Sequence, residues 1–173
     1  RNQEIHSFSQ SIAFGVKEGL IAPRVVNFVS ENSRKLNDAI DQTRNDLFEF
    51  FGLRTLYDRY LLKNPVTRDV IETPQFFWMR VAMGLSLNEA DPTSAALEFY
   101  DSMSRLEYLA AGSTLVNAGT AYSQLSNCFV MQMEDDMEHI AKSVREVMWL
   151  TKGTGGIVLS VTKLRSERSP IRS

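Results

Sequence analysis

Two short apolar segments on either side of an amphipathic helix place the strongest constraint on how this chain folds. Residues 128–131 and 157–161 have the apolar composition of strands, and the first is expected to be buried. Between them, Ile140, Val144 and Val147 recur at the spacing of one helix face. A strand, a helix and a strand in this order form a parallel pair with a right-handed crossover. The sequence therefore predicts an α/β sheet.

Local signals set the ends of this helix. Asp135, followed three residues later by Glu138, resembles a capping box, in which a side chain accepts a backbone N–H at the helix start. The helix is expected to continue to about Thr151. Three glycines then end it: Gly153, Gly155 and Gly156.

The residues before the first strand are predicted to form one helix after another. Apolar residues recur at three- and four-residue steps, which predicts helices over 5–20, 25–29, 35–40, 44–51 and 53–62. Gly52 is expected to end the fourth. Two N-cap residues, each followed by a proline, start longer helices: Thr73 opens one to about Leu87, and Asp91 opens one to about Tyr108.

The composition excludes several classes of protein. The chain is 43% hydrophobic and 23% charged, as soluble globular domains are, and its net charge of −2 offers no basic surplus for nucleic acid. No apolar run approaches the roughly 18 residues that a membrane span needs. The single cysteine cannot form an internal disulfide, which favours a reducing, cytoplasmic setting.

A sheet of only two parallel strands would leave edges unpaired. Such a sheet is not stable alone, and residues 165–173 contain three arginines but nothing that could cover it. The sequence therefore predicts that a partner polypeptide completes the sheet.

Three features could carry chemistry, and each also has a structural explanation. Cys128 is either an accessible redox thiol or a small buried hydrophobe, the commoner role of a lone cysteine. The glycine-rich segment 152–156 either approaches phosphates with its backbone amides or ends the preceding helix. Asp135 and Asp136 offset the helix dipole. The two histidines lack metal-ligand partners at useful spacing, so no metal site is predicted.

Taken together and in order, several segments resemble the large, catalytic subunit of ribonucleotide reductases. The segments that carry the resemblance are Leu56–Leu61, Glu72–Gln75, Met79–Ala82, Ser113–Thr120, Gln124–Cys128, Gly155–Ile157, and Arg165 with Ser169–Ile171. They span nearly the whole sequence. The resemblance implies that residues 1–110 form the family's helical N-terminal region. It also implies that residues 111–173 begin its ten-stranded α/β barrel, which is incomplete without a partner chain.

The resemblance implies a role for seven residues. Cys128 would be one half of the thiol pair that supplies the reducing electrons, and its matching cysteine lies outside this sequence. Thr114 would hold the substrate phosphates and Asn127 would lie beside the substrate ribose. The remaining four act through backbone or charge: Gly155 and Gly156 approach the substrate, Asp136 binds the ribose or base of an allosteric deoxynucleotide, and Arg165 binds its phosphates.

The resemblance also implies partners. These are the remaining large-subunit polypeptide, a radical-generating small subunit with a di-metal centre, and a second large subunit packed through the helix 137–151. Thioredoxin or glutaredoxin would be the reductant, and deoxynucleotides and ATP would be the effectors. The chain itself is expected to bind no cofactor and to be inactive alone, because the radical-forming cysteine is absent. The chain is interpreted as the N-terminal fragment of a split large subunit; a truncated gene, an intein-flanking segment or a cleaved subunit would give the same sequence.

Three departures from the family pattern keep alternatives open. Val158 and Arg168 stand where the family usually has glycine, and the regulatory ATP-binding cap is missing. A reductase that uses adenosylcobalamin shares the Ser126-Asn127-Cys128 type of motif. A non-catalytic deoxynucleotide-binding regulatory module is the alternative from another class. A plain helical interaction domain would leave the cysteine and glycine segments unexplained.

Overall fold

The computed structural model of the chain describes residues 5–153 and 155–171. The chain divides into two compact units, one ending at Leu125 and the other beginning at Ser126. In the part of the chain that is described, no helix is both long and apolar enough to span a membrane.

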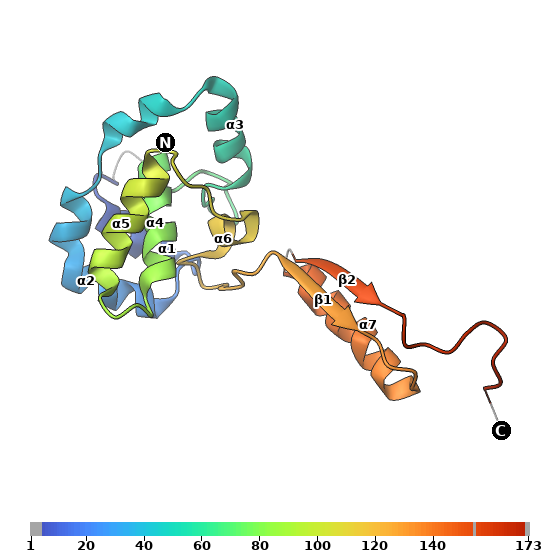
Figure 1. Cartoon of the computed structure of the whole chain (residues 1–173). Coiled ribbons are helices and arrows are strands. Elements are labelled where there is room, and N and C mark those ends of the chain that lie inside the picture. Colours follow the sequence, from blue (N-terminus) through green and yellow to red (C-terminus); the bar gives the residue numbers. More distant parts are fainter. Residues whose placement is uncertain (1–4, 154, 172–173) are drawn as a thin grey trace. The chain divides into compact units, whose positions relative to one another are not determined.

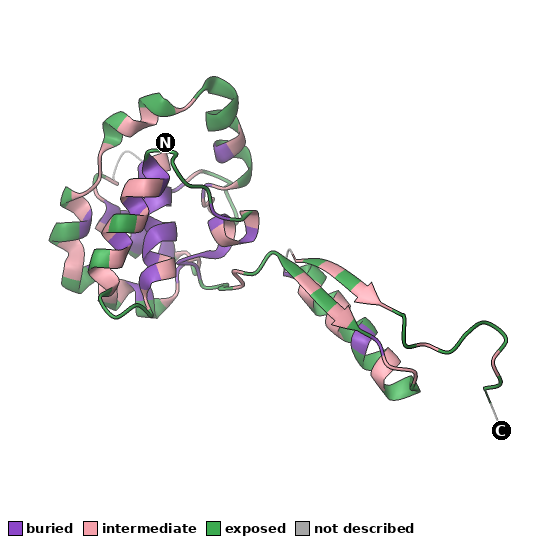
Figure 2. Cartoon of the chain, in the orientation of Figure 1, coloured by how far each residue is buried: buried purple, intermediate pink, exposed green. Residues whose placement is uncertain are grey.

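The first unit, called here the helical unit, is built around one buried helix (Figure 1). Its helices are α1 (Phe8–Lys17), α2 (Pro23–Asp38), the 3-10 helix η1 (Gln42–Leu47), α3 (Phe50–Arg59), α4 (Pro74–Ser86), α5 (Pro92–Ser104) and α6 (Gly112–Asn117). Helix α4 contacts α1, η1, α5 and α6, so it has no solvent-exposed face. Figure 2 shows most of α4 as buried, and Phe77, Met79 and Met83 have no exposed surface.

The starts of α4 and α5 confirm the predicted caps. Thr73 Oγ1 accepts the N–H of Phe76, and an oxygen of Asp91 accepts the N–H of Ser94. The predicted end of α5 near Tyr108 is wrong. The helix ends at Ser104, because Leu106 adopts a left-handed backbone with φ of 61°. The short helix α6 was not predicted.

Two other boundaries from the sequence are also wrong. The segment 35–40 does not form a helix of its own, because α2 continues without a break to Asp38. Gly52 does not end a helix but lies inside α3. The break comes earlier, at Phe48, whose extended backbone ends η1 and lets a new helix start at Phe50.

The second unit, called here the βαβ unit, confirms the predicted strand, helix and strand. Strands β1 (Cys128–Gln132) and β2 (Gly156–Ser160) pair in parallel, with Cys128 opposite Gly156. Helix α7 (Met137–Lys152) connects them and contacts β2 (Figure 1). Within the described residues the sheet has two strands and is not closed. This arrangement agrees with the beginning of an α/β barrel.

The start of α7 lies one residue later than the predicted capping box. Asp136, not Asp135, is the N-cap, and its Oδ1 accepts the N–H of His139 at 3.0 Å. Asp135 instead forms an ion pair with Arg165. The predicted stop is confirmed, because Gly153 is the C-cap.

The two faces of the sheet differ in exposure, and this corrects the prediction of a buried strand. Phe129 and Met131 are half-buried, whereas Cys128 and Val130 between them are exposed. Successive residues of a strand point to opposite faces, so the thiol lies on the open face together with Gly156 and Val158. The interpretation of Cys128 as a small buried hydrophobe is therefore wrong.

Candidate functional site

The exposed thiol lies at the start of the parallel strand pair, next to two other predicted site residues. The N–H of Gly156 donates to the carbonyl oxygen of Asn127 at 2.8 Å. The side-chain amide of Asn127 lies 3.7 Å from the Cys128 sulfur. A Cβ on Gly156 would be 3.9 Å from that sulfur. The structure thus brings Asn127, Cys128 and Gly156 together on one open face.

Gly155 differs from Gly156 in what surrounds it. A Cβ on Gly155 would lie 2.7 Å from the Phe129 ring and 3.2 Å from the Leu150 carbonyl oxygen. A side chain at this position would therefore push the end of α7 away from β1. Glycine at position 155 is therefore required by packing, while the surroundings of Gly156 leave room for a ligand next to the thiol.

Thr114 belongs to the helical unit, in the middle of α6. Its hydroxyl donates to the carbonyl oxygen of Leu125 at 2.9 Å, and the Asn117 side-chain amide donates to the Gln124 carbonyl oxygen at 2.7 Å. These two bonds fix the backbone just before the Asn127-Cys128 dipeptide. The predicted substrate-binding residues are therefore divided between the two units, with Thr114 in one and the other three in the other.

Of the two predicted effector residues, Asp136 lies at the amino end of α7 and Arg165 pairs with its neighbour Asp135. Asp136 caps the helix, and the neighbouring Asp135 carboxylate accepts the Nε–H of Arg165 at 2.7 Å. The Arg165 Nη1 also donates to the Pro170 carbonyl oxygen at 2.9 Å. A guanidinium is thus held close to a helix N-terminus by the loop that follows β2.

Arg168 lies in a tight turn of that loop. The N–H of Ser169 donates to the Ser166 carbonyl oxygen at 3.1 Å, and Arg168, the third residue of the turn, has φ of 68°. Glycine is preferred at this position of a turn, because a Cβ is strained at positive φ. The geometry explains why glycine suits this position.

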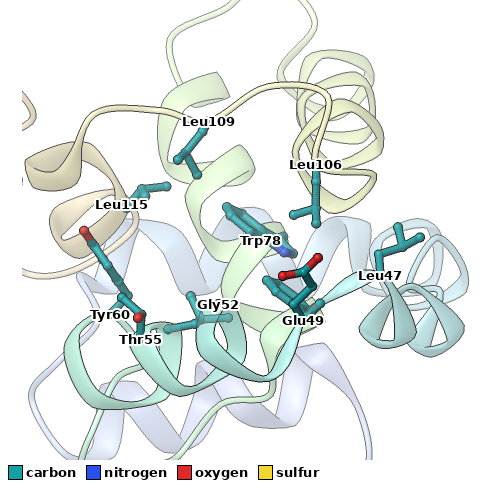
Figure 3. Close-up of a pocket in the computed structure, with 11 residues that line it drawn as sticks. Leu47, Glu49, Gly52, Thr55, Tyr60, Trp78, Leu106, Leu109 and Leu115 are labelled. Atoms are coloured by element: carbon teal, nitrogen blue, oxygen red, sulfur yellow. The ribbon is translucent and has the colours of Figure 1, made fainter.

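A separate apolar pocket of about 550 Å³ lies in the helical unit (Figure 3). Its lining includes Tyr60 at the C-cap of α3, Trp78 from α4 and Leu115 from α6. The Trp78 indole N–H is buried and has no hydrogen-bond partner among the described residues. None of the predicted site residues lines this pocket.

Sequence reasoning missed a buried ion pair that contacts the Thr114 segment. Arg80 and Glu72 are both buried, and Arg80 also donates to the carbonyl oxygen of Ala118. The available signal was an arginine inside the apolar run 76–83, eight residues after a glutamate. Among the described residues, no group of three or more His, Cys, Asp or Glu side chains could hold a metal ion.

Comparison with known protein families divides the chain at the same place as the structure does. Residues 46–123 match the ribonucleotide reductase all-alpha domain, and residues 126–173 match the ribonucleotide reductase barrel domain. The chain belongs to the ribonucleotide reductase large-subunit family. The border between the two matches coincides with the border between the helical unit and the βαβ unit.

Individual reductase large subunits are similar over most of the chain. The ribonucleoside-diphosphate reductase subunit alpha of Chlamydia trachomatis is 42% identical over 137 residues, which are 79% of this chain and 13% of that protein. The large subunit of Arabidopsis thaliana is 38% identical over 159 residues, or 91% of this chain and 19% of that protein. The subunit alpha of Helicobacter pylori is 42% identical over 131 residues, 76% of this chain and 16% of that protein. The chain thus spans less than a fifth of these reductases.

Proposed function

We propose that this chain supplies the N-terminal part of the catalytic subunit of a ribonucleoside-diphosphate reductase, which reduces ribonucleotides to deoxyribonucleotides by radical chemistry. The chain would act only after assembly with the remaining large-subunit polypeptide and a radical-generating subunit. The observation that carries the proposal is the exposed Cys128 thiol on the open sheet face, next to Asn127 and Gly156.

The proposed role of Cys128 is to supply electrons together with a second cysteine from the remaining polypeptide. The two thiols would give up two electrons and two protons and form a disulfide. The ribose 2′-hydroxyl would leave as water, and C2′ would end with a hydrogen in its place. An accessible thiol suits this role, because external thioredoxin or glutaredoxin must reduce the disulfide again.

The proposed substrate-binding residues are Asn127, Gly155 and Gly156 in the βαβ unit and Thr114 in the helical unit. Asn127 and the backbone at Gly155 and Gly156 would lie beside the ribose, since the open surroundings of Gly156 admit close approach. Thr114 would bind the substrate phosphates by turning its hydroxyl from the Leu125 carbonyl oxygen to a phosphate oxygen. In the proposed division of the chain into domains, residues 1–110 form the helical N-terminal region and residues 111–173 begin the catalytic barrel.

The allosteric effector, a deoxynucleotide or ATP, would bind at the amino end of α7. A carboxylate accepts several hydrogen bonds, so Asp136 can cap the helix and also accept from a ribose hydroxyl. Arg165 would bind the phosphates with its forked guanidinium, which the Asp135 carboxylate already orients.

The proposed protein partners are supported by exposed apolar surface. The unpaired edges of the two-stranded sheet would be completed by strands of the remaining large-subunit polypeptide. A second large subunit would pack on α7, whose Val144, Met148 and Trp149 are 49%, 69% and 63% exposed. The radical would come from a di-metal small subunit or, in the alternative reductase class, from adenosylcobalamin.

The experiment that tests the proposal is ribonucleotide reduction by this chain mixed with the remaining polypeptide and the radical-generating subunit. Turnover is expected only in the full mixture. Cys128→Ser is expected to abolish turnover with thioredoxin as reductant. Dependence on added adenosylcobalamin would identify the alternative class.

Val158 and Arg168 favour a second candidate, a regulatory deoxynucleotide-binding module. Deoxynucleotide binding by the chain alone, without turnover in any mixture, would establish that candidate instead.

A further inference from the structure

The guanidinium of Arg80 is fully buried in the helical unit, on the helix that forms its core. Its Nε and Nη2 donate to the two carboxylate oxygens of Glu72, each at 2.9 Å. Glu72 in turn accepts the N–H of Leu62 at 2.9 Å. A buried charge is costly unless it is paired and hydrogen-bonded, and this bidentate pair meets both conditions.

The third contact of Arg80 extends this pair to α6. Its Nη1 donates to the carbonyl oxygen of Ala118 at 2.6 Å. Ala118 is the C-cap of α6, and its own N–H donates to the Thr114 carbonyl oxygen at 2.9 Å. Two consecutive hydrogen bonds therefore connect the Arg80 guanidinium to the residue proposed to bind the substrate phosphates.

The backbone around this contact leaves no spare space. Gly119, which follows Ala118, has φ of 75°, and a Cβ on it would lie 2.7 Å from the Arg80 carbonyl oxygen. A Cβ on Gly84 would overlap the Gly119 backbone nitrogen. Helix α4 therefore holds the 118–119 turn by direct backbone contact as well as through the guanidinium.

The same short helix also holds the chain that follows it. Thr114 and Asn117 donate side-chain hydrogen bonds to the carbonyl oxygens of Leu125 and Gln124. A shift of α6 would therefore move both the Thr114 hydroxyl and the backbone that precedes Cys128.

We propose that Glu72 and Arg80 are positioning residues for the substrate loop, residues 113–120. The proposal rests on the proposed function for the identity of that loop. Arginine is required because its rigid fork reaches both Glu72 oxygens and the Ala118 carbonyl oxygen at once. An apolar side chain of similar volume would fill the space but leave the loop without this anchor.

The first test is amide hydrogen exchange on the whole chain carrying Arg80→Lys. Lysine keeps the buried charge beside Glu72, but its single ammonium lacks the fork that reaches Ala118 as well. The loop amides of Leu115, Ala118 and Thr120 are expected to exchange about 10- to 100-fold faster, while amides of α5 are unchanged. The matched control is Arg44→Lys, in a second arginine network with Asp41 and Asp101. It should leave the loop amides unchanged.

A second variant keeps the test valid if Arg80→Lys fails to fold. The double substitution Glu72→Gln with Arg80→Met removes both charges together, so no unpaired charge is left in the core. It is expected to speed exchange in the same loop. Unchanged loop exchange in a folded variant, or equal acceleration throughout the helical unit, would overturn the proposal.

The functional test separates positioning from a purely structural role. In the reconstituted reductase, Arg80→Lys is expected to raise the KM for the ribonucleotide about tenfold, with kcat changed much less. A purely structural role would lower the amount of active enzyme and leave KM unchanged, which would overturn the proposal. If the wild-type mixture shows no turnover, the proposed function fails, and the exchange experiment still decides whether Arg80 positions the loop.

Discussion

The helical unit and the βαβ unit differ in how much core they form from their own side chains. In the helical unit, Phe77, Met79 and Met83 are completely buried. In the βαβ unit, Met133, Ser143 and Gly153 are the only residues classed as buried within the described part of the chain (Figure 2). The helical unit therefore covers its core with its own helices, whereas the βαβ unit needs further polypeptide to cover its sheet. Helices around α4 cover each other, whereas one helix cannot cover both faces of a sheet.

The largest expected difference between the units comes from removing a phenylalanine ring from each. Phe77→Ala in α4 should lower the free energy of unfolding of the helical unit by about 3–5 kcal/mol, because the cavity lies in a closed core. Phe129→Ala in β1 should cost well under half of that, since the ring is already half-exposed. Urea denaturation followed by circular dichroism measures both. Equal costs would contradict the comparison.

A second pair of variants tests how tightly the helical unit is packed. Gly84→Ala should destabilise it by about 1–3 kcal/mol, because the added methyl group overlaps the Gly119 backbone. Gly52→Ala should instead stabilise it by roughly 0.5–1 kcal/mol, since Gly52 lies inside α3 and an added methyl group would meet only the Phe48 ring, at 3.9 Å. Thermal unfolding of both variants checks the signs. Destabilisation by both would show that α3 is also packed against a surface.

The βαβ unit should depend more on local hydrogen bonds than on packing. Asp136→Ala removes the N-cap of α7 and should destabilise that helix by about 1 kcal/mol. The N–H of Ile140, which donates to the Asp136 carbonyl oxygen, should exchange faster. Asp135→Ala is the matched control, because it removes only an exposed ion pair with Arg165. Equal exchange rates in the two variants would argue against Asp136 as the cap.

The turn at Arg168 offers a small gain in the βαβ unit. Arg168→Gly should relieve the strain of a side chain at positive φ and stabilise the turn by about 1 kcal/mol or less. Faster local exchange of the Ser169 amide would contradict this expectation. Tighter deoxynucleotide binding in the same variant would connect the turn to the proposed effector site.

The smallest expected effect is the dependence of stability on pH that Tyr100 gives the helical unit, which acts only at alkaline pH. Burial raises the pKa of its hydroxyl above the usual value of about 10, while Tyr100 donates to Gln75 and accepts from the Asp41 N–H. The folded state then holds the proton more tightly than the unfolded state. The resulting stability is present below pH 10 and is lost as pH rises through the folded pKa. Urea midpoints from pH 8 to 11 should fall, and Tyr100→Phe should flatten the decline.

The features that the sequence predicts well depend on residues close to one another in the chain. The caps at Thr73 and Asp91 are signalled within four residues, and the alternation of strand and helix in the βαβ unit follows from composition and spacing. The exposure of Cys128 could not be predicted, because it depends on what covers the sheet rather than on the strand itself.

The candidate site was predictable to a similar extent. Parallel pairing after a short crossover brings Cys128 close to the glycines that precede β2, so their proximity follows from topology. The pairing of Glu72 with Arg80, and the bond from Thr114 to Leu125, join segments that only the tertiary fold brings together. The end of α5 depends on the left-handed Leu106, a residue type that gives no signal for that conformation.

The chain contains two tryptophans, and the fold places one in each unit. Trp78 is 2% exposed beside the apolar pocket, and Trp149 on α7 is 63% exposed. Their fluorescence should therefore differ in wavelength, with short-wavelength emission from Trp78 and long-wavelength emission from Trp149. With Trp149→Phe the emission reports the helical unit alone, and with Trp78→Phe it reports the βαβ unit. A polypeptide that covers α7 should then shift the Trp149 emission to shorter wavelength and leave the Trp78 emission unchanged. Tryptophan fluorescence can therefore follow assembly without an added probe.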